Sequence, residues 1–243
     1  MNRFFRMIFV GLFVFLHAGS RLSASAQELL PRGAPNGLYP LWETPGYVLS
    51  HRQIVLGTSH AQFGILDRLH LGVSPVEMLY RVPNGHLKVS LYKNPSIHVA
   101  LQLGVFAILA GADESFFSSN YTSRLANPDH PLFAIPLSVA TSWPIAPWLN
   151  LHNTLTLLTV LAEAPIQNDV TVGDFVSAEL VAARHHSFFL HAGEIGFWEH
   201  DLAVLGVSYR LLVGWFEARV GYFMRFSAEG MQSNPSLSLA AIF

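Results

Sequence analysis

The chain has 243 residues, of which 51% are hydrophobic and only 12% are charged, and it contains no cysteine. Charged residues make up roughly 25% of an ordinary soluble domain, so this composition argues against a soluble enzyme. The lack of cysteine excludes disulfides and thiolate chemistry. The formal net charge of −2 argues against nucleic acid as a partner.

Residues 1–26 are expected to form a cleavable signal peptide. Arg3 and Arg6 precede a short apolar run, 7–16, and Ala24-Ser25-Ala26 fits an A-x-A cleavage site that places the mature start at Gln27. The apolar run is far shorter than the ~20 residues that a membrane-spanning helix needs. Cleavage would remove three of the 14 basic residues and no acidic one, which leaves 11 basic against 16 acidic residues.

The Pro- and Gly-rich residues 27–45 are expected to be irregular. After them, short runs alternate between apolar and polar residues; Leu69, Leu71 and Val73, for example, are separated by His70 and Gly72. A period of two is typical of a strand with one apolar face. A proline at position 136 predicts a bulge in its strand. The segments expected to be strands are 51–65, 68–79, 86–92, 97–109, 132–143, 149–162, 174–183, 187–196, 202–212, 216–226 and 235–243.

The connections between these runs alternate in length. Tight turns near 93–96, 143–148, 184–186 and 213–215 alternate with longer, more polar loops such as 111–130. This pattern, with apolar residues spread over alternate positions, predicts an all-β, antiparallel, up-and-down transmembrane β-barrel with short periplasmic turns and longer extracellular loops.

The expected barrel occupies residues 46–243. Because such barrels have even strand numbers, a twelfth strand is expected within 36–50, and ten strands is the fallback. A soluble β-sandwich also alternates, but it has no reason to carry both a signal peptide and the terminal pattern described next.

The last eight residues, 236–243, alternate and end on Phe243. This ending resembles the C-terminal signal of bacterial outer-membrane barrels. The segment 62–73, followed by Pro83-Asn84 and 87–91, resembles the opening hairpin of uncharacterised outer-membrane barrels. The resemblance implies an outer-membrane location, contact with outer-membrane lipid and with the barrel-insertion machinery, and a first periplasmic turn near residues 66–68. It implies no activity.

The polar side of the alternating runs should line the lumen. Side chains can fill the interior of a barrel of ~8 strands, whereas a barrel of ~16 strands leaves an aqueous channel. A barrel of twelve strands lies between these sizes, so two arrangements of its lumen are possible. The lumen is either a narrow path for small solutes or an interior filled by charge pairs. The main inward candidates are His70, Lys88, His98, Gln102, His152, Glu179, Arg210, Glu217, Arg219 and Arg225, with Ser90, Asn150, Thr154, Thr156 and Ser208 on the same face.

No catalytic, metal or cofactor site is predicted. The histidines are scattered rather than grouped at metal-ligand spacing. His185, Ser187 and Glu199 resemble the His-x-Ser…Glu spacing of outer-membrane lipid A deacylases, which implies a hydrolase as the alternative. Phe188 stands where that family has Asn, and 44 residues follow Glu199. The preferred hypothesis is an outer-membrane barrel that admits small solutes. Besides the hydrolase, a third hypothesis is a structural or adhesion barrel that acts through the 111–130 loop.

Overall fold

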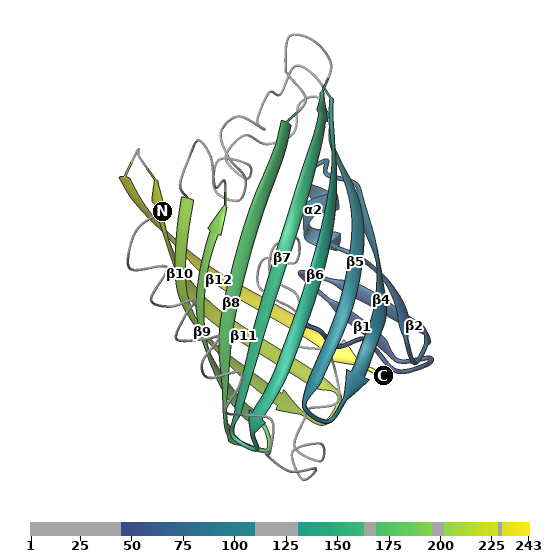
Figure 1. The fold of residues 1–243 in the computed structure, drawn as a ribbon, viewed down its shortest axis with the longest axis vertical. Coiled ribbons are helices and arrows are strands. Elements are labelled where there is room, and N and C mark those ends of the chain that lie inside the picture. The colour runs from purple at the N-terminus through teal and green to yellow at the C-terminus, as the bar shows by residue number, and fades with distance from the viewer. Residues whose placement is uncertain (1–44, 110–130, 163–168, 196–201, 228–229) are drawn as a thin grey trace.

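The computed structural model describes residues 45–109, 131–162, 169–195, 202–227 and 230–243, and these form a closed barrel of twelve antiparallel strands (Figure 1). Every strand pairs with its neighbours in sequence, and the first pairs with the last. The predicted fold class is therefore confirmed. In chain order the strands are β1 (Ile54–Gly57), β2 (Ala61–Leu66), β3 (Leu69–Val73), β4 (Asn84–Asn94), β5 (Ile97–Ile108), β6 (Leu132–Ala146), β7 (Leu149–Ala162), β8 (Asp169–Ala183), β9 (His186–Ile195), β10 (Leu202–Val213), β11 (Phe216–Ser227) and β12 (Gly230–Ile242).

The side chains are distributed inside out relative to a soluble protein. On β10, Leu205 and Val207 are 46% and 52% exposed on the outside, whereas Ser208 and Arg210 are 5% and 1% exposed on the inside. Strands of 10–15 residues, as in β4–β12, are long enough to cross a bilayer. An apolar exterior around a polar interior is the arrangement of a bacterial outer-membrane barrel. The protein therefore resides in the bacterial outer membrane.

Within the described ranges, no helix is both long and apolar enough to cross a membrane.

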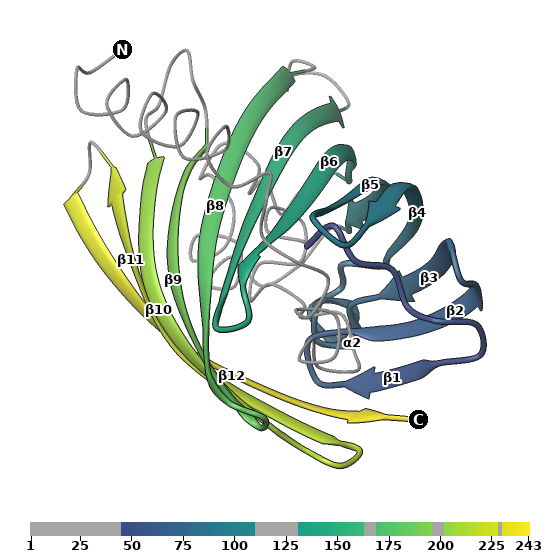
Figure 2. The ribbon, with the colours of Figure 1, turned by 60° about the horizontal axis from the view of Figure 1, so that its bottom comes forward.

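The barrel wall is low on one side. β1, β2 and β3 have only four, six and five residues, while β6, β7 and β8 have 14 or 15 (Figures 1 and 2). A short helix, α2 (Pro75–Leu79), follows β3 at the end of the barrel opposite the turn between β4 and β5 (Figure 1). The short strands β1–β3 are paired with the longer strands β4 and β12 on either side, but they cover only part of the height of the barrel.

The sequence-based boundaries were wrong in this low region. The expected strand 51–65 is two strands, because residues 58–60 turn the chain between β1 and β2. The expected strand 68–79 ends at Val73, because Pro75 cannot donate to the sheet ladder and instead begins α2. The twelfth strand expected within 36–50 is absent from the described part, 45–50; residues 36–44 lie outside the described residues.

The bulge predicted at Pro136 is also wrong. Pro136 pairs in register with Leu158 of β7, and the register shift in β6 falls between Pro144 and Ala146. On the other side of Pro136 stands Gly104 of β5, where a Cβ atom would lie only 2.8 Å from Cγ of the proline ring. The glycine leaves room for the ring, and β6 keeps the same register with β5 on both sides of this position, from the pair Leu103–Leu137 to the pair Phe106–Ala134.

A short seam closes the barrel. β1 and β12 pair through Val55 and Ile242 and the two residue pairs that follow them. The last residue takes part as well: the Phe243 N–H donates to Ile54 O at 2.8 Å, and the Ile54 N–H donates to Phe243 O at 3.0 Å. The exposed ring of Phe243 stacks on that of Trp215, with centroids 6.1 Å apart, at the rim that carries the short turns. Aromatic rings at this level are typical of the membrane interface.

Candidate functional site: the polar lumen

The structure places all ten main candidates on the inward face of the wall, and all ten are buried. They come from seven different strands, so closure of the sheet, and not sequence proximity, brings them together. Phe243 lies outside, exposed at the seam. Ala26 and Gln27 lie outside the described residues. The ten are His70, Lys88, His98, Gln102, His152, Glu179, Arg210, Glu217, Arg219 and Arg225.

Glu179 is the centre of a buried hydrogen-bond network. Its Oε1 pairs with the Arg210 guanidinium, and its Oε2 accepts from Asn150 Nδ2 at 3.0 Å and from His152 Nε2 at 3.3 Å. The other nitrogen of His152, Nδ1, accepts from the Ser142 hydroxyl at 2.7 Å. A buried carboxylate requires such partners, because an unpaired charge is costly away from water.

The chain of contacts from Ser142 through His152 to Glu179 has the residue types of a serine hydrolase relay. The Ser142 side chain, however, is fully buried, and its oxygen accepts a hydrogen bond from the Gly46 N–H at 2.8 Å. A substrate carbonyl has no access to the hydroxyl in this arrangement. The network therefore acts here as a means of satisfying buried polar groups.

Two arginines lie side by side further round the wall. Arg210 of β10 and Arg219 of β11 are direct partners in the register. Both guanidinium groups lie over the ring of Phe189, at 5.3 Å and 4.3 Å from its centroid. Arg210 Nη2 also donates to Ser187 Oγ at 3.2 Å, and Arg219 Nε donates to Ser208 Oγ at 3.2 Å. The aromatic face and the hydroxyls compensate part of the cost of burying two like charges.

Residues 45–50, which we term the inner segment, cross the lumen instead of joining the wall. The segment is the start of the darkest ribbon in Figure 2, which leads from beside β5 and β6 towards β1. Lys88 Nζ donates to the backbone oxygen of Pro45, and the Leu49 N–H donates to Nδ1 of His70 at 3.2 Å. The inner segment is thus fastened to lumen side chains of β3, β4 and β6.

Tyr47 and Gly46 fit the inner segment against the wall. The Tyr47 ring contacts the ring of His98 edge-on, with centroids 4.7 Å apart, and that of His152 at 5.9 Å. A Cβ atom on Gly46 would lie 2.4 Å from the backbone oxygen of His98 and 2.9 Å from the Ser142 nitrogen. Only glycine allows so close an approach of two backbones.

Sequence reasoning missed the inner segment, Ser142 and Tyr47, and it considered Ser187 only as part of the deacylase-like spacing and not as a lumen residue. Ser142 and Ser187 do lie on the inward parity of their strands, so the alternation could have identified them. Tyr47 could not be found in this way, because it is not in a strand.

His185 and Ser187 of the deacylase-like spacing do not come together. His185 is exposed in the turn after β8 and donates from Nδ1 to Leu212 O at 2.7 Å, whereas Ser187 is buried in the lumen against Arg210. Glu199 lies outside the described residues. Among the residues with described positions, no group of three or more His, Asp and Glu side chains is arranged to hold a metal ion.

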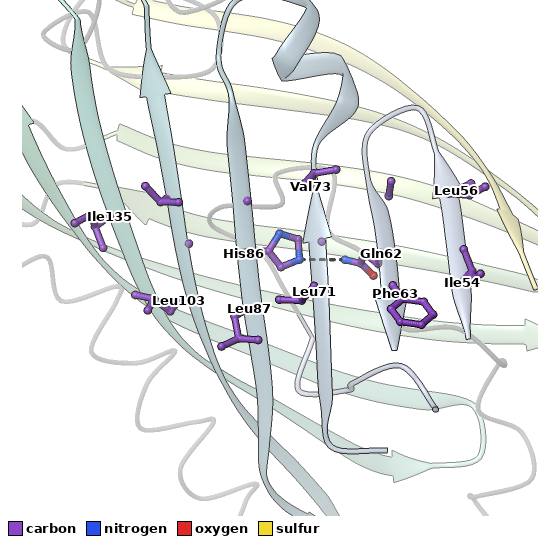
Figure 3. Close-up of a pocket in the computed structure, with 15 residues that line it drawn as sticks. Ile54, Leu56, Gln62, Phe63, Leu71, Val73, His86, Leu87, Leu103 and Ile135 are labelled. Carbon is purple, nitrogen blue, oxygen red and sulfur yellow. Dashed lines mark hydrogen bonds between the residues drawn. The ribbon is translucent and has the colours of Figure 1, made fainter. Parts of the chain in front are cut away.

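A hollow of about 910 Å³ lies on the low wall (Figure 3). It is lined mainly by exposed apolar side chains such as Leu56, Phe63, Leu71 and Leu103, while Gln62 and His86 meet each other between them, 3.5 Å apart. These apolar side chains belong to the outward parity of β1–β5. The hollow therefore belongs to the lipid-facing surface and is separate from the polar lumen.

No family model matches the chain, and no curated protein matches it. Its fold is similar to solved structures of OmpT, an outer membrane protein of Vibrio cholerae. The in-vitro folded trimer form is 9% identical, with 90% of this chain and 74% of that chain covered and a TM-score of 0.49. The loop L8 deletion mutant is 10% identical, with 76% of this chain and 62% of that chain covered and a TM-score of 0.49. Outer-membrane expressed OmpT is 9% identical, with 92% of this chain and 75% of that chain covered and a TM-score of 0.44. This chain thus spans less than two thirds of the deletion mutant, and at these identities the likeness concerns the barrel fold alone.

Proposed function

We propose that the protein is a narrow passage for small polar solutes across the outer membrane, closed in this state by the inner segment. The observation that carries the proposal is the crossing of a polar, charged lumen by a piece of chain that is not part of the wall. A barrel of twelve strands has an interior between the filled and the open extremes. Movement of the inner segment would then decide whether the lumen is closed or open to solutes.

The fastening of the inner segment is weak compared with that of the wall. It consists of hydrogen bonds from Gly46, Leu49 and Lys88, of the contacts of the Tyr47 ring and of the packing of the buried Leu49 side chain against Val55 and Ala240. Each hydrogen bond contributes about 0.5–1.5 kcal/mol net. The wall, by contrast, is a continuous ladder in which loss of one bond leaves the others in place. Displacement of the segment therefore costs far less than opening of the barrel.

The experiment is single-channel recording of the purified barrel in planar bilayers. Tyr47→Ala removes the ring between His98 and His152, and we expect longer open times and at least a twofold rise in mean conductance. Tyr92→Ala is the matched control, because Tyr92 is exposed on β4 and does not touch the inner segment. Folding of each variant is checked by the mobility of unheated samples on gels.

A wild-type protein and a Tyr47→Ala variant that are both silent although folded would overturn the passage and favour a structural or adhesion barrel. The proposal includes no catalytic step, so lipid A from expressing cells should keep all its acyl chains in mass spectra. Loss of acyl chains, abolished by Ser187→Ala, would establish the hydrolase instead.

A further inference from the structure

The hollow on the low wall has a floor that lacks large side chains. Ala61 and Gly85 lie on the outward face there; in the register Ala61 stands between Leu56 and Val73, and Gly85 stands beside Val105. A Cβ atom on Gly85 would have only one atom within 4 Å, a backbone oxygen at 3.8 Å. The space above Gly85 is therefore open, and the hollow as a whole, about 910 Å³, is as large as many small-molecule pockets.

The walls of the hollow are apolar and face the membrane. Phe63, Leu71, Leu87 and Leu103 are direct partners in the register and form one row across β2 to β5 (Figure 3). Three of the four are 44–48% exposed. Water in the hollow would find few polar partners on this row, and an empty hollow would forfeit the dispersion contacts of its lining. Hydrocarbon is the medium that fills such a space.

The hollow begins at the periplasmic rim of the barrel. Ile54, which lines it, bonds to Phe243 at the rim that carries the short turns, and short turns face the periplasm in barrels of this class. From this rim β1–β3 rise by only four to six residues, whereas a strand needs about 9–11 to cross the bilayer. The hollow therefore meets the acyl chains of lipids on the periplasmic side.

Two guanidinium groups lie at the same rim. Arg52 precedes β1 by two residues, Arg68 directly precedes β3, and both are exposed. Hydrogen bonds hold the two segments together: the Arg52 N–H donates to Gly64 O at 2.8 Å, and the His51 N–H donates to Asp67 Oδ1 at 2.9 Å. Basic side chains at the edge of a membrane attract anionic lipid headgroups.

We propose that the hollow binds one phospholipid of the periplasmic leaflet, with an acyl chain in the hollow and the phosphate at the level of Arg52 and Arg68. The site goes beyond solute passage and does not depend on it. Lipid tails are as apolar as leucine, so van der Waals packing against a concave surface and the headgroup charge retain the lipid. A second copy fits less well, because a convex barrel wall cannot reach the floor formed by Ala61 and Gly85.

The first test is native mass spectrometry of the intact barrel after incubation in detergent with dipalmitoylphosphatidylglycerol. We expect one retained phospholipid on the wild-type barrel. Gly85→Phe places a ring in the open space and should reduce the retained lipid at least fivefold. Ala192→Phe is the matched control, because Ala192 is exposed on the outward face of β9, which contributes nothing to the hollow. The control should retain the lipid, and the mobility of unheated samples checks folding.

The second test concerns the headgroup. The double variant Arg52→Gln/Arg68→Gln should reduce the preference for dipalmitoylphosphatidylglycerol over dipalmitoylphosphatidylcholine at least threefold. An unchanged preference would overturn the placement of the phosphate. In an equimolar mixture of phosphatidylglycerol and lipid A, the wild-type barrel should retain the phospholipid; retention of lipid A instead would overturn the assignment to the periplasmic leaflet.

The third test locates the acyl chain. In vesicles that contain phosphatidylglycerol with a photoreactive diazirine in its acyl chain, most of the label should fall on β2–β5 of the wild-type barrel, and Gly85→Phe should remove this excess. Label spread evenly over all strands of the wild type would overturn the site. A folded wild-type barrel that retains no phospholipid would overturn it as well, and a dimer abolished by Gly85→Phe would assign the hollow to a second copy.

Discussion

At the scale of single residues, burial sets the chemistry of the lumen. Each inward charge is removed from water, so its neighbours decide whether it is tolerated. Glu179 has Arg210, His152 and Asn150 as partners. The alternation of the sequence predicted that Glu179, His152 and Arg210 face inward, but it could not pair them. They lie on β7, β8 and β10, and only the curvature and register of the sheet bring their side chains into contact.

Glu179→Gln should destabilise the barrel by about 3–5 kcal/mol, because it leaves the buried Arg210 guanidinium without its carboxylate. Urea unfolding followed by the mobility of unheated samples measures the change. Ser177→Ala, a buried neighbour on the same face of β8, is the control and should cost far less. The double variant Glu179→Gln/Arg210→Gln should recover part of the stability; equal stability of Glu179→Gln and wild type would contradict the role assigned to the pair.

At the scale of elements, the low wall and the inner segment are where sequence patterns were least informative. The run 51–65 looks like one strand because its alternation continues through a turn, and three-residue turns need no proline or glycine cluster. Residues 45–50 were expected to contribute to a strand, yet they lie in the lumen. Their polar backbone groups are satisfied by side chains of distant strands, which no local pattern reveals.

Gly46→Ala should loosen the inner segment without unfolding the barrel. The added Cβ would lie 2.4 Å from the His98 backbone oxygen, which belongs to the wall and cannot retreat. We expect increased open probability in planar bilayers together with unchanged resistance of the folded band to heat. Gly85→Ala is the matched control, since its nearest atom would be 3.8 Å away. A Gly46→Ala protein with wild-type conductance would show that the segment does not close the lumen.

The seam between β1 and β12 gives a second prediction about elements. Ile54→Pro removes the N–H that donates to Phe243 O and should prevent closure, whereas Ile54→Val keeps it. The expected result is loss of the compact, heat-resistant band on gels for the proline variant alone. Proline tolerated at this position would mean that the seam contributes little to closure.

At the scale of the whole molecule, the inside-out distribution decides where the protein resides. The outer surface displays leucine, valine and phenylalanine side chains from nearly every strand, and the inner surface carries the charges. Hydrocarbon can solvate the first surface but not the second. The same distribution separates the apolar hollow of the low wall, which faces lipid, from the polar lumen behind it.

The absence of native cysteine allows a direct test of this orientation. Single cysteines at positions 204, 205, 207 and 208 of β10, labelled with a fluorophore, should be quenched by brominated lipid only at 205 and 207. Leu205 and Val207 face outward, and Val204 and Ser208 face inward. Labels that are quenched alike at all four positions would contradict a transmembrane strand at β10.

The sequence by itself determined the class of fold, the long strands from β4 onward and the face on which each lumen residue stands, because a period of two is a local property that every strand carries in its own residues. Only the tertiary structure decided which lumen side chains meet, that β1 and β2 are separate strands, and that residues 45–50 cross the interior. These features depend on closure of the sheet, which places residues nearly a hundred positions apart within hydrogen-bonding distance, as Gly46 and Ser142 show.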